Sequence, residues 1–145
     1  MLGGPSPPRK ILLVEDNLDH VVITRQAVAA ILPCEVEVVR DGAAALTRLT
    51  DPTSGRARPD LILLDLHLPS MSGIDVLRRV RRDPAYAGTP IIVLTAAGED
   101  EDLILECYAS GASSFLPKPA TDKRFAEALR VLTAGDARDT VPPPA

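Results

Sequence analysis

Short apolar runs alternate with amphipathic stretches along most of the chain. Three of the runs are nearly continuous in Ile, Leu and Val, which is typical of strands covered on both faces of a sheet. The run that begins at Glu35 alternates polar and apolar residues instead, as an edge strand does. The pattern predicts five strands, at Lys10–Glu15, Glu35–Arg40, Asp60–Asp65, Pro90–Thr95 and Ser113–Leu116.

The stretches between the strands predict helices, because each combines a helix-starting polar residue with apolar positions three or four apart. Ser72 and Asp75 form a capping box before the third helix. The expected helix starts, in chain order, are Asp19, Asp41, Ser72, the acidic run 99–102 and Asp122. Strands and helices therefore alternate strictly along the chain.

Such an alternation predicts a parallel sheet with helices on both faces, because the crossovers between parallel strands are right-handed. The fold class is therefore α/β, with a doubly wound five-stranded sheet built from five βα units. The folded domain should run from residue 9 to residue 134. Residues 1–8 and 135–145 are rich in Gly and Pro and are expected to be flexible tails, with no output domain.

The composition narrows the possible partners. With 145 residues, 46% of them hydrophobic and 25% charged, and a net charge of −4, the chain resembles an ordinary globular protein. It lacks the clustered positive face of a nucleic-acid binder, and it has neither a signal peptide nor a long apolar span. We therefore expect a cytoplasmic protein that binds neither nucleic acid nor membrane. Cys34 and Cys107 lack the spacing of a metal-ligand pair.

Polar residues end or follow four of the predicted strands, namely Glu15 and Asp16, Asp65, Thr95, and Lys118. Because parallel strands end at one edge of the sheet, these side chains should converge there. Crowded carboxylates repel one another unless a cation intervenes, and Mg²⁺ favours carboxylate and phosphate oxygens. Asp65 would then attack phosphorus and form an acyl phosphate, with Lys118 and Thr95 binding the transferred oxygens. Singly, each residue also has an ordinary structural explanation; their shared position indicates a site.

These residues stand in the motifs "LLVEDN", "LILLDLHLP", "IIVLTA" and "GASSFLPKP", with which the chain resembles the receiver domain of bacterial two-component response regulators. The resemblance implies a flavodoxin-like fold with strand order 2-1-3-4-5. It implies that Asp65 accepts a phosphoryl group from a sensor histidine kinase, with self-catalysed transfer and autodephosphorylation rather than a separate enzyme activity. It also implies that Glu15, Asp16, Asp65 and the backbone carbonyl of His67 hold Mg²⁺.

The resemblance further implies a conformational switch, in which the Thr95 hydroxyl moves toward the phosphoryl group and Phe115 turns into the space vacated. A plain core position is the alternative for Phe115. The Lys118–Pro119 peptide is implied to be cis, whereas an ordinary trans loop also fits the sequence. The side chain of His67 borders the expected pocket, and it would either act on the hydrolytic water or have no role.

Two features suggest a particular partner and surface. The long connection "TDPTSGRARP" and the wording "DLHLP" are similar to stand-alone regulators paired with bacterial phytochromes, so the kinase is expected to be a bacteriophytochrome. Residues 99–133, which hold the fourth helix, fifth strand and fifth helix, correspond to the usual partner and dimer face of receivers. The apolar residues of that fourth helix exceed what one helix can bury, so we expect a homodimer.

Two other functions compete with this interpretation. A phosphatase of the haloacid dehalogenase type also uses a strand-end Asp, but its motif needs Asp and Thr where this chain has His67 and Pro69. A receiver-shaped scaffold that never carries phosphate would be expected to lack one of the pocket residues, and the sequence lacks none.

Overall fold

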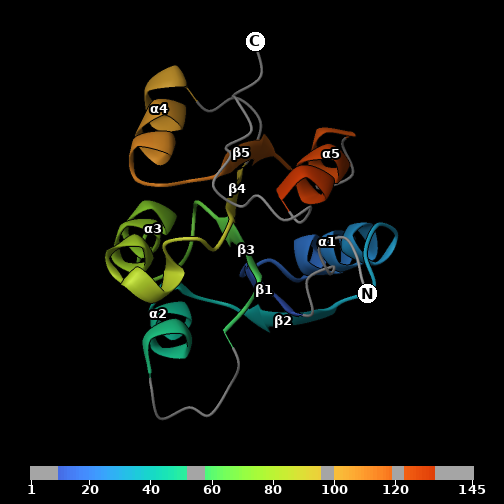
Figure 1. Ribbon diagram of the computed structural model, residues 1–145, viewed down its shortest axis with the longest axis horizontal. Helices are drawn as coiled ribbons and strands as arrows, with labels where there is room; N and C mark the ends of the chain where they lie inside the picture. The colour runs from blue at the N-terminus through green and yellow to red at the C-terminus, as the bar shows by residue number, and fades with distance from the viewer. Residues whose placement is uncertain (1–9, 52–57, 96–99, 119–122, 133–145) are drawn as a thin grey trace.

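The computed structural model describes residues 10–51, 58–95, 100–118 and 123–132 (Figure 1). Five parallel strands form one sheet in the order β2-β1-β3-β4-β5, which confirms the predicted fold class and strand order. The strands are β1 (Lys10–Val14), β2 (Glu35–Val39), β3 (Leu61–Asp65), β4 (Ile91–Thr95) and β5 (Ser114–Pro117).

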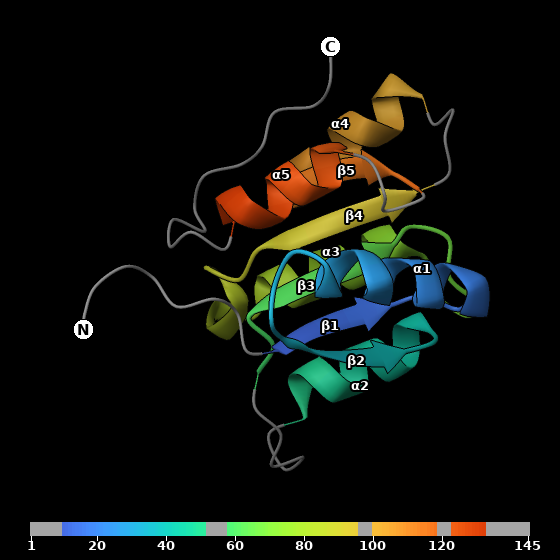
Figure 2. The same ribbon diagram turned by 90° about the vertical axis from the view of Figure 1, so that its right-hand side faces the viewer.

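Helices cover both faces of the sheet, as Figures 1 and 2 show. On one face lie α1 (Leu18–Ala29) and α5 (Lys123–Leu132). On the other lie α2 (Gly42–Thr50), α3 (Gly73–Arg82) and α4 (Glu101–Ala109), and the short 3-10 helix η1 (Pro84–Tyr86) follows α3. No helix in the described ranges has both the length and the apolar character that crossing a bilayer requires.

The sheet separates two hydrophobic cores because successive strand residues point to opposite faces. In β3, Ile62 and Leu64 pack toward α2, α3 and α4, whereas Leu61 and Leu63 pack toward α1 and α5. Every residue of β3 and β4 is buried, while β2 lies at the edge and is only partly covered. The continuous and alternating apolar patterns therefore distinguished central strands from the edge strand correctly.

Side-chain caps fix where the helices begin. Asp41, Ser72 and Asp100 each accept a hydrogen bond from the backbone N–H three residues later, at 2.7, 3.3 and 2.8 Å. The expectation that Asp19 begins α1 is wrong, because Asn17 has the extended backbone of a cap and its Oδ1 accepts from the N–H of His20. Asp19 lies instead in the first turn. Asp122 lies outside the described residues.

The last strand is shifted by one residue from its expected position. Ser113 precedes β5, where its Oγ accepts a hydrogen bond from the N–H of Ile91 at 3.1 Å. Pro117 ends the strand, which is tolerated because β5 lies at an edge of the sheet and needs no donor on its outer side.

Candidate functional site

The first acidic residues stand where β1 leaves the sheet. Glu15 is buried, and its backbone N–H donates to the carbonyl of Val39 at 3.0 Å, which extends the pairing of β1 with β2 by one residue. The N–H of Asn17 donates to Glu15 Oε2 at 3.3 Å, so the cap of α1 also orients this carboxylate. Arg40 donates to the carbonyl of Asp16 at 3.2 Å and fixes the neighbouring backbone.

Asp65 is the last residue of β3 and is 4% exposed. Its Oδ1 accepts from the N–H of His67 at 3.2 Å. The start of α3 lies directly behind it, since a Cβ on Gly73 would stand 2.5 Å from the carbonyl oxygen of Asp65. Only glycine permits this approach, which aligns the helix against the strand end and holds Asp65 in place.

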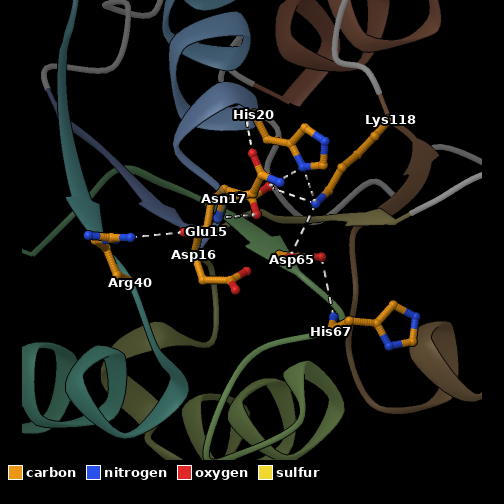
Figure 3. A network of polar contacts seen from close by, with 8 residues as sticks. All are labelled: Glu15, Asp16, Asn17, His20, Arg40, Asp65, His67 and Lys118. Carbon is orange, nitrogen blue, oxygen red and sulfur yellow. Dashed lines mark hydrogen bonds and ion pairs between the residues drawn. The ribbon is translucent and has the colours of Figure 1, made fainter.

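The Lys118 side chain contacts two buried carboxylates from its position just after β5. Its Nζ lies 2.7 Å from Glu15 Oε1 and 3.2 Å from Asp65 Oδ2 (Figure 3). Its own backbone N–H donates to the carbonyl of Thr95 at 2.7 Å, which anchors the residue just beyond β5. A buried acid at the end of an apolar strand is thus compensated by a cation that reaches it from another strand.

Three carboxylates gather here in a way that fits a divalent cation. One oxygen each from Glu15, Asp16 and Asp65 lies within 4.8 Å of the others. Burial raises the pKa of Asp65 to about 6, the nearby charge of Glu15 adds to the rise, and the Lys118 ammonium opposes it. The charge that Lys118 leaves uncompensated, together with the all-oxygen donor set, suits a hard ion such as Mg²⁺.

Thr95 and Phe115 occupy neighbouring strands beside this cluster. Thr95 ends β4 at the same edge of the sheet and is buried. Phe115 is also buried and packs in the core beneath α2, α3 and α4. Its backbone N–H donates to the hydroxyl of Tyr108 at 3.2 Å, so the residue is tied to α4.

The His67 side chain is exposed and lies away from the acids (Figure 3). Together with the following residues it borders an open groove of about 540 Å³, lined by Leu66, His67, Leu68, Ser70, Met71 and Ser72. The structure thus brings Glu15, Asp16, Asp65 and Lys118 together and leaves the imidazole outside. The Lys118–Pro119 peptide lies partly outside the described residues, so its cis geometry stays a prediction.

His20 also belongs to the cluster, although the sequence analysis did not identify it. Its Nδ1 lies 3.1 Å from Lys118 Nζ and 3.7 Å from Glu15 Oε1 (Figure 3). The available signal was the cap, because a helix that begins after Asn17 turns its third residue toward the strand end. Placing the start at Asp19 moved the expected helix by two residues and hid this position.

The family model of the response regulator receiver domain matches residues 11–130, which include all the acids and the lysine of the cluster. The chain belongs to this family. Receiver domains are signalling domains, and the roles of the individual residues in the strand-end cluster stay predictions.

Curated relatives agree with this assignment. The chain is 38% identical to the "Probable methanogenesis regulatory protein FilR2" of Methanothrix harundinacea, over 77% of this chain and 73% of that protein. It is 35% identical to the response regulator Rcp1 of Synechocystis sp., over 74% of this chain and 80% of Rcp1.

Solved receivers share the fold. The structure of the phosphorylated cyanobacterial phytochrome response regulator RcpA is 32% identical with a TM-score of 0.74, covering 88% of this chain and 94% of RcpA. The Mn²⁺-bound form of Rcp1 is 29% identical with a TM-score of 0.72, and the match covers 95% of this chain and 100% of the Rcp1 chain.

Proposed function

We propose that this receiver accepts a phosphoryl group on Asp65 from a sensor histidine kinase and thereby controls a partner or passes the phosphate along a phosphorelay. The observation that carries the proposal is the gathering of two further carboxylates, Glu15 and Asp16, and of Lys118 around Asp65. A cluster built only for stability would not concentrate like charges at a partly buried strand end. We take residues 9–134 as the receiver unit.

The chemistry follows from the roles that these groups can fill. An oxygen of the ionised Asp65 carboxylate attacks phosphorus, the P–N bond of the kinase phosphohistidine breaks, and the released imidazole nitrogen takes up a proton from water. Lys118, already 3.2 Å from the carboxylate, stabilises the charge on the transferred group. Hydrolysis by water would restore the carboxylate and release inorganic phosphate, which resets the signal.

A divalent cation, Mg²⁺ in the cell, would supply charge neutralisation for the transferring oxygens. Glu15, Asp16, Asp65 and the backbone carbonyl of His67 are the groups that we propose hold it. Support comes from the oxygen cluster of the three acids and from the Mn²⁺-bound form of the relative Rcp1.

The output would use Thr95 and Phe115. A phosphoryl group at Asp65 attracts the Thr95 hydroxyl, and Phe115 then changes its packing beneath α4. The tie between the Phe115 backbone and Tyr108 gives this change a route to the α4 surface. Phe115→Ala should therefore leave phosphorylation of Asp65 intact but make partner affinity less dependent on phosphate, as measured by binding with and without a phosphoryl donor. Equal phosphate dependence in both proteins would contradict the switch.

We further propose that the kinase is a bacteriophytochrome in the cytoplasm, because two similar receivers, Rcp1 and RcpA, include one named for a phytochrome. The surface of α4, β5 and α5 is the proposed homodimer face. Leu105 on α4 is 60% exposed, which leaves apolar area available for a second copy.

Phosphorylation is tested with the full chain, acetyl phosphate and Mg²⁺, followed by intact-mass measurement. We expect one added phosphoryl group, which disappears in Asp65→Asn and when Mg²⁺ is chelated. Asp60→Asn is the matched control, because it makes the same substitution just before β3, at the amino-terminal ends of the strands and away from Asp65. Absence of modification with any donor would favour a receiver-shaped scaffold, and modification that persists in Asp65→Asn would refute the assignment of the acceptor.

A further inference from the structure

The ammonium of Lys118 has three neighbours that come from three different elements. Glu15 Oε1 at the end of β1 lies at 2.7 Å, His20 Nδ1 on α1 at 3.1 Å, and Asp65 Oδ2 on β3 at 3.2 Å. The contact with His20 is a hydrogen bond, whereas the contacts with Glu15 and Asp65 are ion pairs. Two of the three neighbours are the acids of the proposed reaction, whereas His20 has no assigned role.

The contact with Lys118 indicates which nitrogen of the His20 imidazole accepts a hydrogen bond. Because an ammonium only donates, a hydrogen bond between the two groups requires Nδ1 to accept, and we assign the ring proton to Nε2 on this ground. His20 therefore contributes an accepting nitrogen to the surroundings of the Lys118 ammonium.

The backbone places His20 in this position. Its N–H donates to Asn17 Oδ1 at 3.1 Å, and the N–H of Asn17 donates to Glu15 Oε2 at 3.3 Å. Hydrogen bonds therefore connect the cap residue Asn17 to both Glu15 and His20, and the imidazole of His20 lies beside Lys118 (Figure 3).

We propose that His20 is a positioning residue for Lys118, holding the ammonium between Glu15 and Asp65 through a hydrogen bond accepted at Nδ1. Glu15 is the shorter contact and is buried, so without a third acceptor the ammonium would settle on Glu15 and draw away from Asp65. His20 would act on phosphoryl transfer only through this lysine. The inference rests on the proposed function, since it concerns the same reaction.

Substitutions at His20 separate this role from a contribution to helix stability. In His20→Asn the side-chain Oδ1 replaces Nδ1 at the same number of bonds from the backbone, whereas in His20→Gln the acceptor stands one bond further out. The positioning role predicts that Asn retains activity better than Gln or Ala. Helix propensity predicts the reverse, because Ala and Gln favour a helix more than Asn does.

The assay is the second-order rate constant for phosphorylation of the full chain by acetyl phosphate at fixed pH and saturating Mg²⁺, followed by intact mass. We expect His20→Ala to be slower by about threefold to tenfold and His20→Asn to lie within about twofold of the wild type, as for loss and retention of one hydrogen bond of ordinary strength. Leu18→Ala, an exposed substitution in the same helical turn, is the control and should match the wild type. An unchanged rate in His20→Ala, or an Asn variant as slow as the Ala variant, would overturn the inference.

A spectroscopic measurement tests the hydrogen bond itself. The chain has two histidines, so ¹⁵N-labelled protein gives two imidazole patterns, and the one missing in His20→Asn belongs to His20. We expect an unprotonated Nδ1 and a protonated Nε2, and the opposite tautomer would refute the assignment. If wild-type protein is not phosphorylated at all, the proposed function fails; if it is phosphorylated and the His20 variants behave alike, only this inference fails.

Discussion

Replacing Asp65 by Asn should stabilise the metal-free protein. The carboxyl is 4% exposed, and its pKa rises from 3.8 to about 6, chiefly because of burial and then because of the charge on Glu15. A shift of about two units corresponds to about 3 kcal/mol against the charged form at neutral pH, at about 1.4 kcal/mol per unit. Asn keeps the shape and removes the charge, so we expect Asp65→Asn to raise the free energy of unfolding by about 1–3 kcal/mol.

The difference in unfolding free energy between the wild type and Asp65→Asn should depend on pH. Because the folded protein holds the Asp65 proton more tightly than the unfolded chain, the folded state binds more protons between pH 3.8 and about 6. Wild-type stability relative to Asp65→Asn should therefore fall as the pH rises through this window, and should stay constant above it. Below the window both states are protonated, so the two proteins should differ little.

Urea unfolding followed by far-UV circular dichroism measures the difference, with a chelator present and with Asp60→Asn as the matched control. Adding Mg²⁺ should stabilise the wild type, because an ion that binds only the folded state shifts the equilibrium by mass action, and should stabilise Asp65→Asn much less. If the Asn variant were less stable than the wild type without metal at neutral pH, the raised pKa and the electrostatic account of the site would be wrong.

Two further substitutions test how the strand end is built. Gly73→Ala should destabilise the fold by about 1–3 kcal/mol, because its Cβ would lie 2.5 Å from the Asp65 carbonyl, whereas Gly88→Ala has no atom within 4 Å to meet and should be nearly neutral in the same urea titration. Tyr86→Phe should cost about 1–2 kcal/mol in thermal or urea unfolding, since it leaves the buried Leu49 carbonyl without the 2.6 Å hydrogen bond from the phenol; an unchanged midpoint would contradict this.

Much of the fold could be predicted because the sequence pattern reflects burial directly. The strand that ends at Asp65 is apolar throughout since it lies between two layers of helices, and the polar alternation after Glu35 reflects its place at the edge. Caps were harder. Asn17, Asp19 and the residues around them offer several polar starts, and only the backbone shows that Asn17 has the extended conformation of the cap.

The site was predictable where each residue ends a strand, because the topology alone places strand ends together. His20 was not, since its approach to Lys118 depends on the rotation of α1, and that rotation is set by one cap residue. The Ser113 boundary was missed for a similar reason. The N–H of Ser113 donates to the carbonyl of Ile91 at 2.8 Å, but the N–H of Ile91 donates to the Ser113 hydroxyl rather than to a backbone carbonyl, and an apolar pattern carries no record of such a bond. An error of one or two residues in the predicted start of a helix or strand therefore has little effect on the predicted fold. It has a large effect on which side chains are predicted to reach a site.

The same geometry explains why the cluster is useful and unfavourable at once. Glu15 and Asp65 are buried at the ends of adjacent strands, and a single ammonium neutralises only part of their charge. A cation or a phosphoryl group that arrives at Asp65 changes this balance in opposite directions, because one adds positive and the other negative charge to the same few oxygens. The folded state without a cation therefore carries unfavourable repulsion between carboxylates, and binding of a cation would relieve it. A protein in which this acid was fully paired would have a more stable folded state, but a cation would gain little by binding there.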